Sequence, residues 1–271
     1  MTDSEWQAFS AFRTDFKAVC RQWLNRCGYE YAVPDETLSS VQKSVLSVQK
    51  PAENGKLHLL QQAAAAENKT PAYPQETPIV YNHSFDEVQA SDTIKLIIIS
   101  DNPGKNEQLH KNQRYLVGQA GKVAGGFFRR NPELGIDFRR NVIILNKTPV
   151  HTAKTKELNH LLKYGGEHFR SLFEETQQWL ASHTAALQRA LACPLWLVGY
   201  GELRKKSLFT AYAEELRRQY DGKADAPVYV FQHFSMNCFA IDFKKLSDEH
   251  KSTEENLRAI GLLHRRDVLG W

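Results

Sequence analysis

The sequence predicts a three-layer α/β domain, with a parallel sheet of about four strands, preceded by a helical region. Three observations support this fold class. From residue 94 onward, short apolar segments alternate with longer amphipathic ones, which is typical of strands and helices in a parallel sheet covered on both faces. The run Leu-Ile-Ile-Ile at 96–99 is continuously apolar, as expected for a doubly covered strand. The 271 residues are 42% apolar, enough for a sizeable core.

The alternating region gives four strands and four helices. We expect the strands at residues 95–100, 142–146, 195–199 and 228–232. We expect the helices at residues 121–131, 167–192, 203–220 and 252–263. The last helix begins with a Ser252-x-x-Glu255 capping box. This order divides the chain into residues 1–90, a helical N-terminal extension and linker, and residues 91–271, the α/β domain.

The extension begins with a strongly amphipathic segment. At residues 5–27, aromatic and aliphatic side chains recur every three or four positions, so we expect a helix that packs on the main domain. Residues 35–50 and 56–69 show weaker helical patterns. Residues 70–92 contain three prolines and are interpreted as a connecting arm.

Several classes of protein are disfavoured. No apolar run approaches the roughly 20 residues of a membrane span, and the polar N-terminus lacks a signal pattern, so we expect a cytoplasmic protein without a membrane partner. The spacing of Cys20, Cys27, Cys193 and Cys238 matches no common zinc or redox motif, so we expect free, mostly buried thiols, with a metal cluster as the lesser alternative.

The charge of the chain is uneven. The overall charge is +4, but residues 102–147 contain nine basic and three acidic side chains. This local excess fits a phosphate-bearing partner, and it equally fits an ordinary solvated basic face.

Polar and Gly-rich segments follow all four expected strands. These segments are 101–104 (Asp-Asn-Pro-Gly), 146–148 (Asn-Lys-Thr), 199–201 (Gly-Tyr-Gly) and 233–235 (His-Phe-Ser). The carboxyl ends of parallel strands lie along one edge, where open α/β sheets bind ligands. Asn and His also occur at strand ends as simple turn formers, so their joint placement carries more weight than either alone.

These segments resemble the motifs of the uracil-DNA glycosylase superfamily. Residues 100–104 (Ser-Asp-Asn-Pro-Gly) resemble its first motif in the Asn-Pro-Gly form. Residues 115–121 (Tyr-Leu-Val-Gly-Gln-Ala-Gly) are similar to the Pro-Phe-Val-Gly-Arg-Ala-Gly segment of the iron–sulfur branch. Residues 142–146 resemble the strand that ends in the base-reading Asn, and residues 233–235 resemble the His-Pro-Ser motif. The resemblance covers roughly residues 94–240.

The resemblance implies roles for three catalytic residues. Asn102 would orient the attacking water, although an amide cannot take its proton at neutral pH. Asp101 is the alternative, as a general base, and it also fits a local turn or cap acceptor. His233 would stabilise the departing base anion as a neutral donor, or it is a buried histidine with a satisfied hydrogen bond.

The resemblance also implies a base-binding set. Asn146 would read the base, with the strand-closing Asn as its structural alternative. Leu116 takes the position of the family's stacking Phe, so Tyr115 is the nearest aromatic candidate for stacking. Gly104, which closes the first motif, completes the set.

DNA contacts are expected around this set. Ser235 would bind a phosphate, and Met236 or Asn237 would fill the gap left by an extruded base. Basic side chains would bind further phosphates without reading sequence; the candidates retained are Lys105, Arg114 and Lys147.

The chain departs from the family pattern in identifiable places. Phe234 replaces the Pro of His-Pro-Ser, and no Cys lies near Asn146, so we expect no iron–sulfur cluster, no metal and no other cofactor. The expected function is a monomeric DNA glycosylase that removes uracil or a related damaged base. Two alternatives stay open: a non-catalytic nucleic-acid or nucleotide binder of the same fold, and an α/β enzyme with unrelated chemistry.

Overall fold

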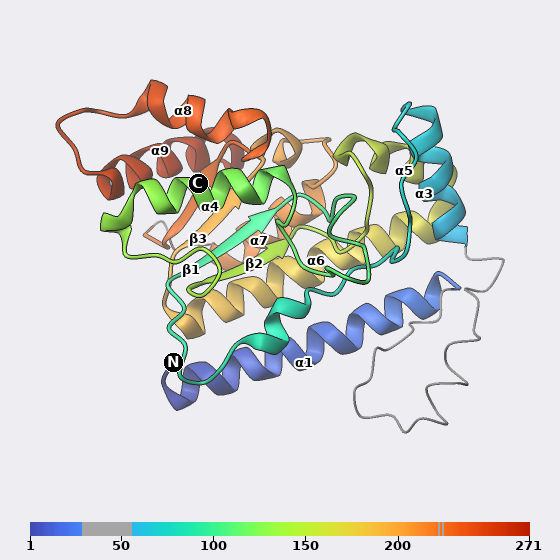
Figure 1. Cartoon of the computed structure of the whole chain (residues 1–271), viewed down its shortest axis with the longest axis horizontal. Helices are drawn as coiled ribbons and strands as arrows, with labels where there is room; N and C mark the ends of the chain where they lie inside the picture. Colours follow the sequence, from blue (N-terminus) through green and yellow to red (C-terminus); the bar gives the residue numbers. More distant parts are fainter. Residues whose placement is uncertain (29–55, 222, 224) are drawn as a thin grey trace.

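The computed structural model describes residues 1–28, 56–221, 223 and 225–271, and it confirms the predicted three-layer α/β fold (Figure 1). The sheet contains β1 (Leu96–Ser100), β2 (Val142–Asn146), β3 (Leu195–Val198) and β4 (Val228–Phe231). All pairings are parallel, in the order β2-β1-β3-β4. The expected helix at 35–50 lies outside the described residues.

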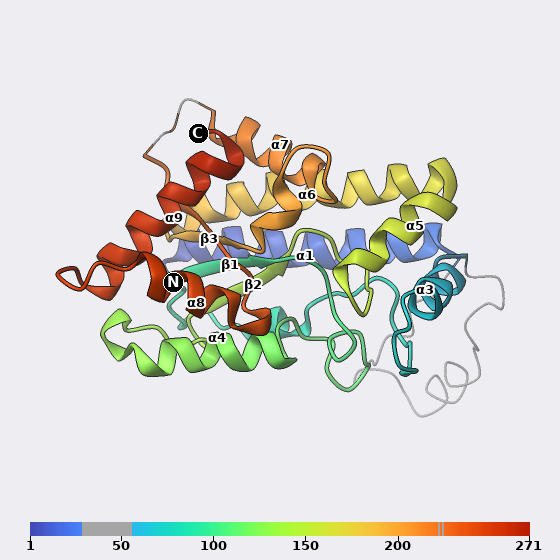
Figure 2. The same cartoon turned by 90° about the horizontal axis from the view of Figure 1, so that it is seen from above.

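Helices cover both faces of this sheet, as Figure 2 shows from above. One face packs against α1 (Asp3–Arg26), α6 (Gly166–Leu191) and α7 (Thr210–Tyr220). The other face packs against α4 (Gln119–Arg130), α8 (Cys238–Leu246) and α9 (Thr253–Leu269). Two further helices, α3 (Lys56–Glu67) and α5 (Leu158–Tyr164), contact each other beside α6.

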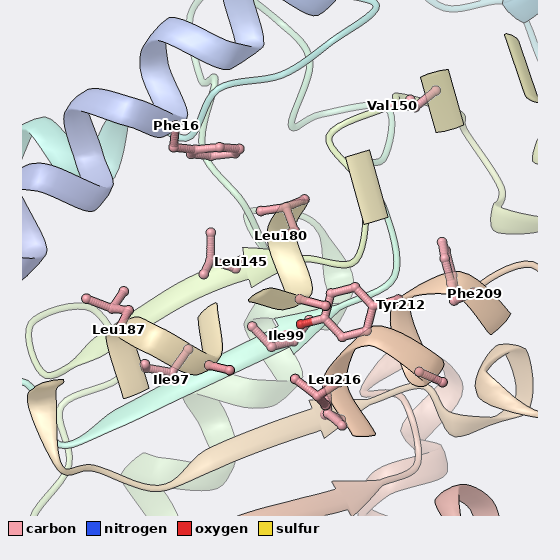
Figure 3. Close-up of a cluster of buried hydrophobic side chains, with 14 of the residues drawn as sticks. Phe16, Ile97, Ile99, Leu145, Val150, Leu180, Leu187, Phe209, Tyr212 and Leu216 are labelled. Atoms are coloured by element: carbon pink, nitrogen blue, oxygen red, sulfur yellow. The ribbon is translucent and has the colours of Figure 1, made fainter. Parts of the chain in front are cut away.

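The strands divide their side chains between two cores, because successive residues point to opposite faces. Ile97 and Ile99 lie in the core on the α1/α6/α7 side, which Figure 3 shows around Leu180 and Tyr212. Leu96 and Ile98 lie in the core on the α4/α8/α9 side. This division fixes which strand-end residues can meet.

Helix α1 is part of the main core. Its first turn is closed by a capping box between Thr2 and Glu5, and its aromatic side chains are buried against the α6 side of the sheet, as expected: Phe9, Phe12, Phe16 and Trp23. The described parts of residues 1–90 therefore share one hydrophobic core with the α/β domain.

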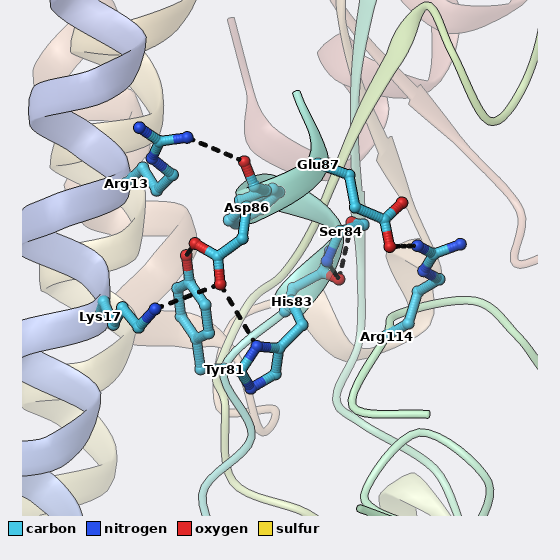
Figure 4. A network of polar contacts seen from close by, with 10 residues as sticks. Arg13, Lys17, Tyr81, His83, Ser84, Asp86, Glu87 and Arg114 are labelled. Carbon is cyan, nitrogen blue, oxygen red and sulfur yellow. Dashed lines mark hydrogen bonds and ion pairs between the residues drawn. The ribbon is translucent and has the colours of Figure 1, made fainter. Parts of the chain in front are cut away.

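Polar contacts also join α1 to the arm before β1 (Figure 4). Lys17 forms an ion pair with Asp86 at 3.2 Å, and His83 lies 3.3 Å from the same carboxylate. Arg13 donates to the Phe85 carbonyl at 3.4 Å. Glu87 in turn pairs with Arg114. The arm is thereby fixed on both sides.

Most predicted elements are observed within a few residues of their expected limits. Two helices, α5 and α8, were not predicted, and α9 runs to Leu269 rather than ending at 263. Helix α7 begins at Thr210 and not at 203, because a 3₁₀ turn at Tyr200–Leu203 and turns at 204–209 precede it. The cysteines are free thiols, and Cys20, Cys27 and Cys193 are buried. Within the described ranges, no helix is both long and apolar enough to span a bilayer.

Candidate active site at the strand ends

The register of the sheet sorts the strand-end residues into two groups. Ser100 of β1 and Asn146 of β2 are paired across the strands. By alternation they point to the α4/α8/α9 side, as Ile98 and Ile144 do. The residues that follow them, Asp101 and Lys147, point to the opposite side. The polar edge therefore contains two adjacent sites rather than one.

Asn146 is the most unusual member of the first group. It is only 1% exposed, and among the described residues neither its Oδ1 nor its Nδ2 has a hydrogen-bond partner. A buried polar group left unpaired costs about 1–3 kcal/mol, so such groups require an explanation in a native structure. A bound group that offers one donor and one acceptor would satisfy this carboxamide.

His233 lies next to Asn146 through their shared neighbour Ser100. The Ser235 backbone N–H donates to His233 Nδ1 at 3.0 Å, so the ring proton is on Nε2. Nε2 then donates to Ser100 Oγ at 3.0 Å. Burial is the main cause that lowers the pKa of His233, opposed by the nearby Asp101 carboxylate. The ring is therefore a neutral donor aimed at the strand-end cluster.

Asn102 is held by the loop after β2. Its Nδ2 donates to Thr152 Oγ1 at 2.9 Å and to the Val150 carbonyl at 3.3 Å. A carbonyl only accepts, so this contact identifies the amide nitrogen and leaves Oδ1 as an acceptor. The partly exposed Asn102 is therefore preset to orient a donor such as water.

Asp101 and Lys147 form a buried ion pair on the opposite side, with 2.6 Å between Oδ1 and Nζ. The Lys147 side chain is fully buried, donates to the Val198 carbonyl at 2.6 Å and lies over the Phe209 ring. Burial lowers the pKa of Lys147, and Asp101 opposes this effect. Lys147 is therefore not placed to bind a DNA phosphate, contrary to the sequence-based expectation.

The same pair explains a glycine at the third strand end. Gly199 has a φ of +86°, and a Cβ there would lie 2.5 Å from Asp101 Oδ1. A side chain at this position would displace the carboxylate from Lys147. The Gly-rich turn after β3 thus accommodates the ion pair, and Asp101 is engaged with a buried cation and not with the Asn146 side of the edge.

The aromatic expected to stack on a base is enclosed in the core. Tyr115 is fully buried, and its hydroxyl donates to the Val80 carbonyl at 2.5 Å. Leu116 is only 3% exposed and has a φ of +51°. Neither side chain is presented to the open edge, so the expected stacking role has no support in this arrangement. Gly104 is partly exposed, with open space where a Cβ would be.

The residues expected to contact DNA fall into two groups, those that are exposed and those already bonded within the chain. Met236 is 84% exposed with a φ of +52°, and Lys105 is exposed. Arg114 is already paired with Glu87 (Figure 4), and Ser235 Oγ lies 2.7 Å from His233 Nδ1. Met236 and Lys105 are therefore exposed to a partner, although Lys105 also lies over the Tyr73 ring, whereas Arg114 and Ser235 have polar partners within the chain.

Two residues that hold the 101–104 turn were missed in the sequence. His151 is buried, its Nδ1 lies 2.8 Å from the Pro103 carbonyl, and burial lowers its pKa to about 4. Glu107 is buried and accepts from the Gly104 N–H at 3.1 Å. In a capping box, a Glu side chain reaches back to the backbone N–H three residues earlier. The Gly-x-x-Glu pattern at 104–107 has this spacing and could have identified Glu107 from the sequence.

A large cavity lies away from these residues. It has a volume of about 810 Å³ and is formed by the end of α1 with α3, α5 and α6; its lining includes Leu60, Phe169 and Leu172 but none of Asn102, Asn146 and His233. The candidate site is therefore identified by the arrangement of its polar side chains and not by this cavity. Comparisons with models of known protein families, with characterised proteins and with solved structures found no match for this chain.

Proposed function

We propose that this chain is a DNA glycosylase of the uracil-DNA glycosylase type, which hydrolyses the N-glycosidic bond of uracil or a related damaged base. The observation that carries the proposal is the buried carboxamide of Asn146, which has no hydrogen-bond partner within the described ranges, beside the neutral N–H of His233. Uracil offers an N–H donor flanked by two carbonyl acceptors, so one base would satisfy both side chains.

The chemistry follows from these groups. The bond from C1′ to the base breaks with its electron pair on the base, and water adds to C1′ and loses a proton to solvent. His233 would move its Nε2–H bond from Ser100 to the base carbonyl, where the negative charge develops. Asn102 Oδ1 would hold the water, and Met236 would enter the space left by the extruded nucleotide.

The alternative is a protein of the same fold that binds nucleic acid or a nucleotide without excising a base. Two observations favour it: Tyr115 is enclosed in the core, and Asp101 is neutralised by Lys147. Both remove groups that a glycosylase would otherwise use at this edge. Binding that weakens with salt, without the formation of abasic sites, would select this alternative.

The test is direct incubation of the protein with single- and double-stranded DNA that contains uracil, hypoxanthine or a mismatch, followed by scoring of abasic sites. We expect cleavable abasic sites from at least the uracil substrate. Asn102→Ala should lose excision and keep DNA binding, while Asn159→Ala, whose exposed side chain donates to the Lys156 carbonyl, should retain both. No excision from any substrate would refute the enzymatic proposal.

A further inference from the structure

Glu107 forms a reciprocal contact with the turn that carries Asn102. The Gly104 N–H donates to Glu107 Oε2 at 3.1 Å, and the Glu107 N–H donates to the Gly104 carbonyl at 3.1 Å. The residue is only 8% exposed, so solvent does not compete strongly for this carboxylate. The turn is therefore closed by a buried anion.

The same carboxylate acts on a second backbone segment. The N–H groups of Leu116 and Val117 also interact with Glu107 and lower its pKa. On the carbonyl side of this segment, Arg139 donates to Tyr115 O at 3.2 Å and also to Leu116 O. The segment before α4 is thus held between an acid and a guanidinium.

This segment has a conformation that needs such support. Leu116 has a φ of +51°, a region that a branched side chain rarely adopts, and strain of this kind costs about 1–3 kcal/mol. Helix α4 approaches so closely that a Cβ on Gly121 would lie 1.5 Å from Leu116 O. The backbone at 115–117 is therefore fixed in place, and Glu107 connects it to the Asn102 turn.

The other side of the turn is anchored independently. The Pro103 carbonyl accepts from the Thr152 N–H at 3.2 Å and lies 2.8 Å from His151 Nδ1. Asn102 itself donates to Thr152 Oγ1. The loop after β2 thus fixes one flank of the turn, and the α4 side is reached through Glu107.

We propose that Glu107 is a positioning residue of this site, whose carboxylate ties the Asn102 turn to the backbone before α4 and so sets where the Asn102 amide holds its water. The proposal rests on the proposed glycosylase function. Glu107 touches neither the base nor the water, and acts through Gly104 on the residue two positions earlier.

The protonation state of Glu107 bears on this link. Burial raises its pKa to about 7, opposed by the three N–H groups and by Arg139. Arg139 and the buried Tyr115 are the titratable groups that interact with it among the described residues. Protonation weakens a carboxylate's bonds to N–H donors, so excision should fall as the pH drops through about 7. Burial lowers the pKa of His233 from 6.5, so its titration is separate from the inflection near pH 7.

The experiment measures kcat and KM for wild type, Glu107→Gln, Glu107→Asp and the exposed control Glu249→Gln on uracil-containing DNA from pH 5 to 9. A small displacement of a reacting group costs on the order of tenfold to a hundredfold, so we expect that loss in kcat for Glu107→Gln, with KM little changed and the inflection near pH 7 removed. Glu107→Asp should retain part of the activity and its inflection, and Glu249→Gln should match wild type.

Two outcomes overturn different claims. An active wild type with an equally active Glu107→Gln, and an unchanged inflection near pH 7, refutes the positioning role alone. An inactive wild type refutes the glycosylase function, and the positioning role with it. Circular dichroism of each variant shows whether it is folded. If Glu107→Gln does not fold, the test rests on Glu107→Asp. An active Glu107→Asp without an inflection near pH 7 then refutes the positioning role.

Discussion

The buried carboxyl of Glu107 should make folding stability depend on pH in a measurable way. Its pKa is raised from 4.5 to about 7, so the folded protein binds the proton more tightly than the unfolded chain does. A group of this kind contributes stability that is fully present below pH 4.5 and is lost as the pH rises through about 7. The variant Glu107→Gln cannot titrate and lacks this dependence.

The magnitude follows from the two pKa values. Integration of the linkage relation between pH 5 and pH 8 gives a loss of about 2.5 kcal/mol for wild type relative to Glu107→Gln. Other titrating groups are common to both proteins and cancel in the difference. The amide of the variant meets backbone N–H donors, which shifts its stability by an amount that is constant with pH and leaves the slope unaffected.

The assay is urea denaturation of both proteins at pH 5, 6, 7 and 8, with the unfolding free energies subtracted at each pH. We expect the difference to change steadily in favour of Glu107→Gln as the pH rises. The control Glu249→Gln, whose carboxyl is exposed, should show a flat difference. A change below about 0.5 kcal/mol for Glu107→Gln would mean that the carboxyl is solvated, and the argument from its burial would be refuted.

Three further substitutions test the remaining geometry. Lys147→Met leaves Asp101 without its partner and should destabilise the fold by about 3 kcal/mol in urea denaturation, whereas adding Asp101→Asn should restore most of this loss. Asn146→Leu removes an unpaired buried amide, so the unfolding free energy should rise by about 1 kcal/mol while excision is lost; a fall in stability would indicate that the amide is paired. Gly121→Ala places a Cβ 1.5 Å from a backbone oxygen and should cost about 3 kcal/mol or more, while Gly201→Ala, with open space around it, should change the melting temperature little.

The fold could be predicted from the sequence because its strands are unambiguous. The segments at 96–99 and 142–145 are continuously apolar and bounded by polar turns, and the observed strands match them closely. Helix α8 was missed because its nine residues are fewer than the roughly 11–18 over which helical periodicity is recognised. Helix α7 was extended too far because the buried Leu208 and Phe209 continue its apolar pattern although they lie in a turn.

The site could be predicted only in part, for a different reason. The positions of Asp101, Asn102 and Asn146 at strand ends follow from local sequence, but their partners come from distant segments. The pairing of Asp101 with Lys147 joins two strands, and Tyr115 is enclosed by contact with Val80 in the N-terminal arm. Charge and aromaticity made Lys147 and Tyr115 attractive as ligand contacts, and only their burial in the folded chain assigns them to structure.

The alternation of side chains at the strand ends decides to which face of the sheet each polar residue points. Ser100 and Asn146 point to the side on which His233 lies; there the Asn146 amide has no partner in the described part of the chain, and the His233 ring N–H donates to Ser100. Asp101 and Lys147, one residue later, point to the other side and satisfy each other. A charged residue is costly to bury without a partner, so the pairing of Asp101 with Lys147 satisfies both charges and keeps them apart from the neutral groups. For this reason the uncharged Asn102, Asn146 and His233 are better candidates for chemistry than Asp101. The ion pair of Asp101 with Lys147 instead holds the backbone next to Asn102.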